Sequence, residues 1–295
     1  MTTNAHSAPA LAPTSPGRAS RLWRGAVRVL RPSGLVAVGF LVTVVTVAVL
    51  APLLAPHDPN LPQLLETFAV PSASHPFGTD ALGRDLLSRL MYGARVMLVA
   101  STAIIVLSTV LGTALALFSA WVGGLVDAAV SRVLDVLFAV PGIIFALAAV
   151  SVLGTGGLSV VIGLTVGYTP YVARVVRGAA LRERKLEYVA AAWTQGRSGF
   201  GICVHHLLPN LRPLIVAQAV SSLGFAVIDL SALSFLGLGT QPPQADWGLS
   251  MRSGLESALR NHPGEALSAG LALALLVASV IVVGERLSLR AEDRR

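Results

Sequence analysis

Long apolar runs separated by short polar segments make up most of this 295-residue chain. Five runs contain at most one charged residue: 34–55, 96–126, 136–173, 213–239 and 266–284. An α-helix rises about 1.5 Å per residue, so roughly 20 apolar residues cross the roughly 30 Å hydrocarbon core of a bilayer. The third run is long enough for two crossings, and the glycines between positions 154 and 157 predict a tight turn that divides it. The pattern therefore predicts an all-α membrane protein with six transmembrane helices.

The composition favours the same class and excludes a soluble protein. Apolar residues make up 54% of the chain and charged residues only 13%, with a mean hydropathy of +0.72. The net charge of +7 comes from basic residues at the edges of the apolar runs, and no basic stripe runs beside aromatic residues as in a nucleic-acid binder. We therefore expect contact with membrane lipid and none with nucleic acid. The single cysteine, Cys203, excludes an internal disulfide and a cysteine zinc site.

Basic clusters set the predicted orientation, because cytoplasmic loops are enriched in arginine and lysine. They lie before the first span, after the fourth and after the last: Arg18, Arg21, Arg24, Arg28 and Arg31; Arg174, Arg177, Arg182, Arg184 and Lys185; Arg286, Arg290, Arg294 and Arg295. Both termini are therefore predicted to be cytoplasmic. The predicted parts are tails at 1–33 and 286–295, a first transmembrane helix at 34–55, an outer loop at 56–95 and a five-helix core at 96–285. A cleaved signal peptide is the alternative for the first run, but its apolar region would be shorter and nearer to its charged start.

The segment between the fourth and fifth spans reads EYVAAAWTQGRSGFGICVHHLLPN (187–210) and is too polar to lie in lipid. Residues 187–195 favour a short helix that ends at Gly196. Residues 200–208 favour a second short helix that ends at Pro209. Three consecutive alanines leave one side of the first helix without bulk. Two short helices with a small-residue face suit insertion into a groove on a partner protein.

This segment resembles the cytoplasmic EAA loop of permease subunits in bacterial binding-protein-dependent ABC importers. The glycine of that pattern falls at Gly196, and its closing Leu-Pro falls at Leu208 and Pro209. The placement of His206, Pro209 and Asn210 is similar to the branch that imports dipeptides, oligopeptides and nickel.

Two further strings resemble the same branch, so that the resemblance extends from the first span through the sixth. They are HPFGTDALGRDLLSRLMYGARVML at 75–98 and ALSFLGLGTQPPQADWG at 232–248. One position departs from the pattern, because Ala190 stands where the acidic residue opens the EAA triplet. Glu187, three residues earlier, matches the branch.

The resemblance implies the type I ABC importer permease fold, with a cytoplasmic coupling helix in a coupling loop at 182–211. It implies a permease subunit of the bacterial cytoplasmic (inner) membrane that works with a second homologous permease, two ABC ATPase subunits and an extracytoplasmic substrate-binding protein. The residues implied to couple the chain to the ATPases are Glu187, Tyr188, Ala191, Ala192, Gly196, His206, Leu208 and Pro209.

The binding protein is expected to deliver the solute near Pro242 and Trp247. Di- or oligopeptides are the expected solute, with nickel or glutathione as alternatives. The spans hold no His, Cys or Met cluster that would suggest metal handling.

The chain lacks the residue patterns of an enzyme, so no catalytic or metal site is predicted and no cofactor is expected in this chain. A phosphate-binding loop needs a lysine after a glycine-rich turn, which the only lysine, Lys185, does not follow. ATP and Mg²⁺ are therefore expected on partner subunits. No serine occupies a G-x-S-x-G turn. His205 and His206 point in different directions on a helix, which favours packing or hydrogen bonding over metal binding.

Two other classes of membrane protein stay open as alternatives. A secondary transporter or channel that works without ATP would commonly carry several polar groups near the midplane, or paired broken helices. A structural or assembly protein would not need the polar segment at 187–210.

Asp229 is the only charged residue inside a predicted span. A central carboxylate costs about 2.5 to 3.5 kcal/mol on insertion scales, and each Leu, Ile, Phe or Val offsets about 0.3 to 0.6 kcal/mol of that cost. The fifth span therefore still inserts. Such a residue normally faces protein or water. We expect Asp229 either to line the pathway or to have a structural hydrogen-bond or ion partner.

Residues near the predicted span ends give three smaller predictions. The charged set in the outer loop is expected to form local ion pairs that brace it: Asp80, Arg84, Asp85 and Arg89. The glycines expected to allow tight turns there are Gly78, Gly83 and Gly93. Trp121 is expected at the inner membrane interface and Trp247 at the outer one.

Overall fold

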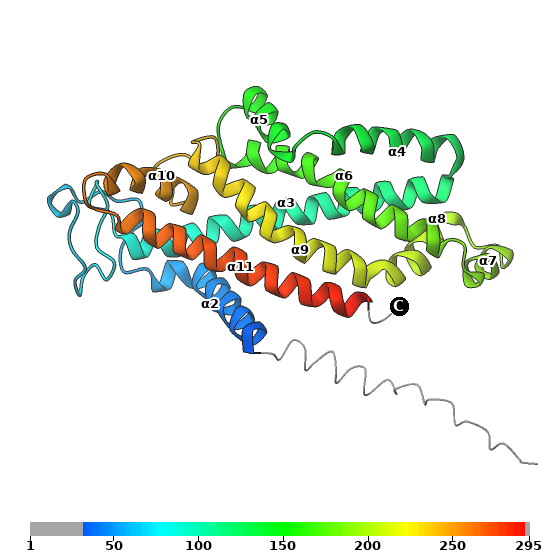
Figure 1. Cartoon of the computed structure of the whole chain (residues 1–295), viewed down its shortest axis with the longest axis horizontal. Coiled ribbons are helices and arrows are strands. Elements are labelled where there is room, and N and C mark those ends of the chain that lie inside the picture. The colour runs from blue at the N-terminus through cyan, green and yellow to red at the C-terminus, as the bar shows by residue number, and fades with distance from the viewer. Residues whose placement is uncertain (1–31, 293–295) are drawn as a thin grey trace, which may run out of the picture.

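Helices make up almost all of the regular structure in the computed structural model of the chain, which describes the backbone of residues 32–292 and the side chains of residues 34–287. The long helices run side by side along the longest axis of the molecule (Figure 1). Within the described residues there is no β-strand, only an isolated bridge between Thr79 and Asp85. The all-α prediction is confirmed. Most of the predicted tail at 1–33 lies outside the described residues, as do Arg294 and Arg295.

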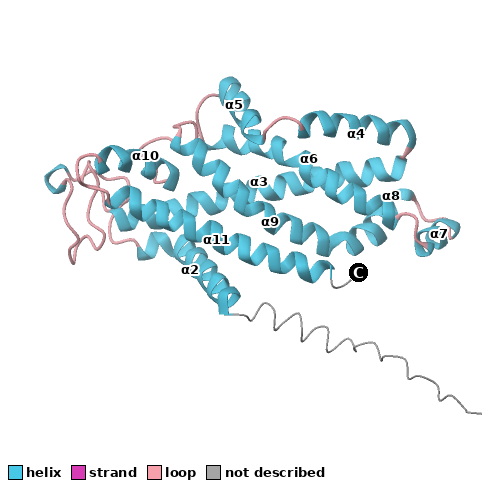
Figure 2. Ribbon diagram, in the orientation of Figure 1, coloured by secondary structure: helices cyan, strands magenta, loops and turns pink. Residues whose placement is uncertain are grey.

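Many of the loops lie at the two ends of the bundle, and others lie along one side (Figure 2). One end carries helix α10 (Trp247–Ala258) and the loop at 55–85, and the opposite end carries the short helix α7 (Glu187–Thr194) (Figure 1). We call these the α10 end and the α7 end.

Among the residues that the structure describes, five helices are long and apolar enough to cross a membrane. They are α2 (Pro32–Leu54), α3 (Leu86–Val122), α6 (Gly157–Glu183), α9 (Leu208–Phe235) and α11 (Gly264–Glu292). A sixth span is present if the bent pair α4 (Gly124–Phe138) and α5 (Gly142–Leu153) is counted as one. The six-span prediction agrees with this architecture.

The third span is not the continuous helix that the uncharged run beginning at 136 predicts. Helix α4 begins at Gly124, before that run, and the chain bends by 85° between α4 and α5. Pro141 lies at the break as the N-cap of α5. Proline has no backbone N–H and its ring clashes with the preceding helical turn, so a helix cannot pass this position without a kink or break. The prediction of an unbroken third span was wrong for this reason.

Helix α3 begins ten residues before the predicted boundary at 96, because a capping residue starts it at Leu86. The side chain of Asp85 accepts a hydrogen bond of 2.7 Å from the backbone N–H of Ser88. Such a cap satisfies one of the free N–H groups of the first helical turn. The outer loop predicted at 56–95 therefore ends at Asp85.

Helix α9 continues through Pro209, where the sequence predicted a helix end. The short helix α8 (Gly199–Ile202) passes into a π-helical turn, η2 (Cys203–Leu207), and then directly into α9. Pro209 lies in the first turn of α9, where a proline is tolerated. The second of the two predicted short helices is therefore the start of the fifth span, and the boundary predicted at 213 was wrong.

Two apolar clusters form the core of the bundle. The larger one joins α3, α6, α9 and α11 and includes Met97, Ile104, Leu164, Leu230 and Leu276. The smaller one lies toward the α7 end and includes Val176, Val189, Ile202, Leu207 and Leu211. Helices α3 and α6 approach closely where α3 has Gly112, since a Cβ there would lie 2.9 Å from the carbonyl oxygen of Thr169. These contacts hold α3, α6 and α9 as the centre of the fold.

The α10 end contains a helix that the sequence analysis did not predict, and its first residue is buried. Trp247 is 2% exposed, and its indole N–H donates a 2.9 Å hydrogen bond to the carbonyl of Leu90. Gly93 leaves room for this ring, because a Cβ there would lie 2.5 Å from Cδ1 of the indole. Two predictions were therefore wrong, since Trp247 lies inside the protein and Gly93 belongs to a helix packed against it.

The predicted ion pairs form around one carboxylate, that of Asp80. Its Oδ2 lies 2.7 Å from Nε of Arg84 and 3.7 Å from Nε of Arg89. Asp85 takes no part in these pairs because it caps α3. Gly78 and Gly83 have φ angles of +79° and +75°, which confirms the turns predicted at these two positions.

Candidate functional site

Helix α7 is the centre of the polar segment singled out by the sequence, and it ends where the sequence predicts. Gly196 has a φ of +77°. Its backbone N–H donates a 3.0 Å hydrogen bond to the carbonyl of Trp193. The backbone N–H of Arg197 donates a 3.2 Å hydrogen bond to the carbonyl of Ala192. These two bonds are the Schellman ending of a helix, which favours glycine at the left-handed position. Glu187 lies in the first turn, where its negative charge suits the helix dipole.

One face of α7 packs on the chain and the other is exposed. Val189 and Ala192, three residues apart on the same face, are 4% and 5% exposed and belong to the smaller apolar cluster. Ala191 and Glu187 are exposed, and Trp193 is 58% exposed. Ala192 was expected to contact a partner, and this was wrong because its side chain lies in the core of this chain. The free face is the one that carries Ala191.

Three polar side chains tie α7 to the spanning helices on both sides, and we call Glu183, Tyr188 and Asn210 the polar latch. The hydroxyl of Tyr188 donates a 2.8 Å hydrogen bond to Oε1 of Glu183, at the end of α6. The side-chain amide of Asn210, in the first turn of α9, donates to the Tyr188 hydroxyl at 2.9 Å and to the same Glu183 oxygen at 3.2 Å. The latch therefore joins α6, α7 and α9.

The chemistry of Tyr188 keeps it a hydrogen-bond donor at neutral pH. Partial burial and the hydrogen bond to the Glu183 carboxylate raise the pKa of Tyr188 to about 12. Its ring also lies near that of His206, with 6.2 Å between the ring centroids. Nε2 of His206 is buried and has no hydrogen-bond partner among the described residues, while Nδ1 of His205 lies 3.0 Å from the carbonyl oxygen of Gly201.

A second contact joins the end of α3 to the same segment. Arg184 donates a 2.5 Å hydrogen bond to the carbonyl of Ala120, in the last turn of α3, and lies over the Trp121 ring at 5.3 Å. That ring lies 5.5 Å from the ring of Trp193, and a Cβ at Gly199 would collide with it. Trp121 therefore packs against α7 and α8. The short segment is in contact with the ends of three spanning helices.

The structure brings only some of the predicted coupling residues together. Tyr188 and His206 are neighbours, whereas Glu187, Ala191, Gly196 and Pro209 are exposed, and Leu208 is half-buried at the start of α9. The roles of Glu183, Arg184 and Trp193 were not predicted. Glu183 and Arg184 lie in the predicted loop at 182–211, but only the fold shows that they face Tyr188 and Trp121.

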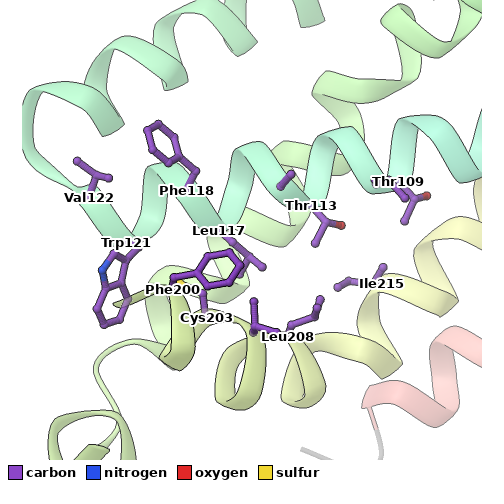
Figure 3. A pocket seen from close by; sticks show the side chains of 13 residues that line it. Thr109, Thr113, Leu117, Phe118, Trp121, Val122, Phe200, Cys203, Leu208 and Ile215 are labelled. Atoms are coloured by element: carbon purple, nitrogen blue, oxygen red, sulfur yellow. The ribbon is translucent and has the colours of Figure 1, made fainter. Parts of the chain in front are cut away.

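An apolar groove of about 650 Å³ lies beside this segment, between α3 and the run from α8 to α9 (Figure 3). It is lined by Leu117, Phe118 and Trp121 from α3, and by Phe200, Leu208 and Ile215 from the opposite wall. Thr109 and Thr113 also line it, and their hydroxyls have no hydrogen-bond partner among the described residues. The other lining side chains are apolar or aromatic apart from Cys203, so the groove is almost wholly apolar.

Asp229 has a partner inside the bundle. Its Oδ2 accepts a 2.8 Å hydrogen bond from the hydroxyl of Tyr168, which connects α9 to α6. The contact agrees with one of the two roles left open by the sequence, that of a structural hydrogen-bond partner. A role in the pathway remains a proposal.

A second hollow, of about 440 Å³, opens at the α10 end. Its walls combine apolar residues of α3 and α6 with the loop that contains Gln241, Pro242 and Gln244. The side chains of Gln241, Pro242 and Gln244 are exposed, unlike that of Trp247. The loop rather than the tryptophan is therefore the accessible part of the string at 232–248.

Three side chains that could bind a metal ion lie close together near the α10 end, which the sequence analysis did not predict. His57, His75 and Asp85 each offer one atom able to bind a metal ion, and these atoms lie within 4.8 Å of one another. The residues are well separated in the chain, so no spacing motif marks them. The turns at Gly78 and Gly83 fold the loop and bring them together.

Comparison with known proteins gives a consistent result. Residues 108–294 match the sequence profile of a family described as "Binding-protein-dependent transport system inner membrane component". The chain is 33% identical to a dipeptide transport system permease protein of Alkalihalophilus pseudofirmus, over 90% of this chain and 88% of that protein. It is 35% identical to a glutathione transport system permease protein of Pectobacterium atrosepticum, over 90% and 87% of the two chains. It is 33% identical to a probable D,D-dipeptide transport system permease protein of Escherichia coli, over 72% of each chain.

Proposed function

The chain belongs to the family of binding-protein-dependent transport system inner membrane components, and from this premise we propose that it is the permease subunit of an ATP-driven importer of di- or oligopeptides. The observation that carries the proposal is the similarity to peptide permeases over most of the chain, together with the exposed helix α7 between two spans. Relatives named for dipeptides and for glutathione, itself a small peptide, favour peptides over nickel. The multi-pass helices fit an inner-membrane protein.

The free face of α7 is the proposed docking site for an ATPase subunit. Ala191 and the neighbouring Ala190 are exposed and small, so a groove on the partner can approach the helix backbone closely. ATP and Mg²⁺ would be bound by two ATPase subunits, and hydrolysis would take place there. The transport subunit itself would carry out no catalysis.

The polar latch is the proposed link between the ATPases and the pathway. When ATP binding moves the two ATPase subunits together, α7 moves with them, and the latch passes this displacement to both α6 and α9. Such a shift between two packed arrangements opens the path on the other side of the membrane. Tyr168 and Asp229, which also join α6 and α9, keep the two helices together as they move.

The remaining partners follow from the same proposal. A second homologous permease would enclose the path with this chain, and an extracytoplasmic binding protein would deliver the peptide at the α10 end. The hollow beside Gln241 and Gln244 is the proposed point of access. The basic residues near α7, among them Arg174, Arg182 and Lys185, support a cytoplasmic α7 end and cytoplasmic termini.

Reconstitution with its partners tests the proposed function. The chain would be purified with a second permease, the ATPases and the binding protein from its own organism and placed in liposomes with a labelled dipeptide outside. We expect uptake that requires both ATP inside the vesicles and the binding protein outside. Uptake that proceeds at the same rate without ATP would contradict the proposal and favour a secondary transporter.

A further inference from the structure

The loop at the α10 end contains a buried group of metal-binding side chains that no part of the proposed transport mechanism uses. His75 is 3% exposed and Asp85 is 1% exposed. Nδ1 of His75 lies 3.0 Å from Oδ1 of Asp85. The ring of His57 stacks on that of His75, with 4.6 Å between their centroids. The three side chains thus present two imidazoles and one carboxylate to a common space.

Further hydrogen bonds orient the two more deeply buried members of this group. Nε2 of His75 lies 2.7 Å from Oε2 of Glu66, so the second ring nitrogen is held by a carboxylate. The other oxygen of Asp85, Oδ2, accepts hydrogen bonds from the N–H and the hydroxyl of Ser88, at 2.7 and 2.6 Å. A histidine that binds a metal usually donates its other N–H to a carboxylate, and a carboxylate ligand is usually hydrogen-bonded as well. Both arrangements are present here.

His57 supplies an independent observation that points to a ligand. Its Nδ1 is buried and has no hydrogen-bond partner among the described residues. A buried polar atom without a partner is costly, and such atoms are few in folded proteins. The backbone N–H of His57 bonds to the Ser88 hydroxyl at 3.1 Å, which fixes the position of this residue beside Asp85.

We propose that His57, His75 and Asp85 bind one zinc ion, with Nδ1 of each histidine and Oδ1 of the aspartate as ligands and Glu66 positioning His75. Two imidazole nitrogens and one carboxylate oxygen are donors that zinc favours, and a water molecule completes a four-coordinate site. Bonds of about 2.0 to 2.2 Å in a tetrahedron place ligand atoms about 3.3 Å apart. A metal ion lies in the plane of each imidazole that binds it, so the His57 ring has to rotate out of its stack on His75 before both Nδ1 atoms can point to one ion. The His57 ring is half-buried and lies in a loop, where such a rotation moves no helix.

The position of the site in the fold indicates its effect. His57 follows the end of α2, and Asp85 is the N-cap of α3, so one ion connects the two ends of the 55–85 loop. A metal that binds only the folded loop stabilises it. The ion has a structural role in this proposal, and it holds the loop beside the hollow at the α10 end. The proposal is independent of the transported solute.

Zinc binding by the full-length chain tests this inference. The chain would be purified with a tag free of histidine, placed in nanodiscs, treated with a chelator and dialysed against micromolar zinc. We expect elemental analysis to find one zinc per chain, which is lost in His57→Phe. Phenylalanine keeps an aromatic ring to stack on His75 but has no nitrogen donor. Glu66→Gln keeps all three ligands but weakens the orientation of His75, so the affinity should fall about 10- to 100-fold.

Control measurements separate loss of the site from loss of the fold. His262 stacks on Phe68, with 4.2 Å between ring centroids, and lies outside the group, so His262→Phe should keep the zinc content of the natural chain. The helical content of His57→Phe in chelator should equal that of the natural chain. X-ray absorption of the zinc-loaded natural chain should show nitrogen and oxygen neighbours with imidazole scattering. The proposal would be overturned if the natural chain retains no zinc, or if His57→Phe retains as much as it does.

Discussion

At the α10 end the helices are joined by buried polar contacts, whereas at the α7 end a short helix is attached by two apolar side chains and the partly exposed polar latch. Asp80, Asp85 and Trp247 are each at most 2% exposed. Asp80 forms an ion pair with Arg89 of α3, Asp85 caps the same helix, and Trp247 donates a hydrogen bond to the Leu90 carbonyl. At the other end only Val189 and Ala192 of α7 are buried. The difference indicates a fixed brace at one end and an attachment surface at the other.

The comparison is tested most strongly by removing one tryptophan from each end. We expect Trp247→Ala to lower the free energy of unfolding by about 3 to 5 kcal/mol, because it removes a buried ring and leaves the Leu90 carbonyl without its bond. Trp193→Ala is the matched control and should cost far less, because its side chain is 58% exposed. Denaturant unfolding in detergent measures both. Equal losses in the two variants would mean that the ends do not differ in stability as described.

A bulky side chain on the free face of α7 should block coupling without harming the fold. We expect Ala191→Trp to reduce ATP-dependent peptide uptake by at least about tenfold, because the indole fills the space that a partner groove needs. Its abundance in the membrane should be unchanged. Ala81→Trp is the control, since Ala81 is an exposed alanine in the loop at the opposite end. If uptake by Ala191→Trp matches that of Ala81→Trp, the docking face has been assigned to the wrong side of α7.

Loss of one hydroxyl from the polar latch should weaken transmission more than stability. Tyr188→Phe keeps the ring beside His206 but removes the bonds to Glu183 and Asn210. We expect about 1 kcal/mol of destabilisation, because the lost hydrogen bonds are only partly buried, and a fall of several-fold in peptide transported per ATP hydrolysed. Parallel assays of uptake and hydrolysis measure this ratio. An unchanged ratio would show that the latch does not transmit the movement of α7.

The smallest effect is expected at the contact between α6 and α9 within the bundle. In Asp229→Asn the side-chain oxygen still accepts the hydrogen bond from Tyr168, so a purely structural role predicts uptake within about twofold of normal. Uptake would be measured at equal abundance in the membrane. A large loss in this variant would instead assign the negative charge itself a role in the pathway.

The sequence predicted the parts of the molecule that depend on local patterns. Uncharged runs located the long helices, and the glycine at 196 located the end of α7, because hydropathy and positive φ are properties of single segments. It did not predict that Trp247 is buried, since this depends on the space left by Gly93, far away in the chain. Pro209 was misjudged for a local reason, because a π-helical turn leads directly into α9 and places this proline in the first turn of that helix, where it is tolerated.

In the candidate site, too, the sequence predicted the features that depend on local patterns and missed those that depend on contacts between distant segments. The sequence identified the segment at 187–210 and the residues Tyr188 and His206, which are neighbours in the fold. It placed Ala192 on the partner side, because three consecutive alanines do not reveal which one faces the core. The partners of Tyr188, and the meeting of His57, His75 and Asp85, depend on how α6, α9 and the 55–85 loop are arranged in space.

The central claim is that the free face of α7 binds an ATPase, and co-purification tests it most directly. The tagged natural chain and its Ala191→Trp variant would be extracted gently from the native membrane, and their partners identified by mass spectrometry. The account predicts that an ATPase with a phosphate-binding loop and a second permease accompany the natural chain, and that the variant loses the ATPase but keeps the permease. A natural chain that is isolated without any ATPase, or a variant that retains it fully, would contradict the account.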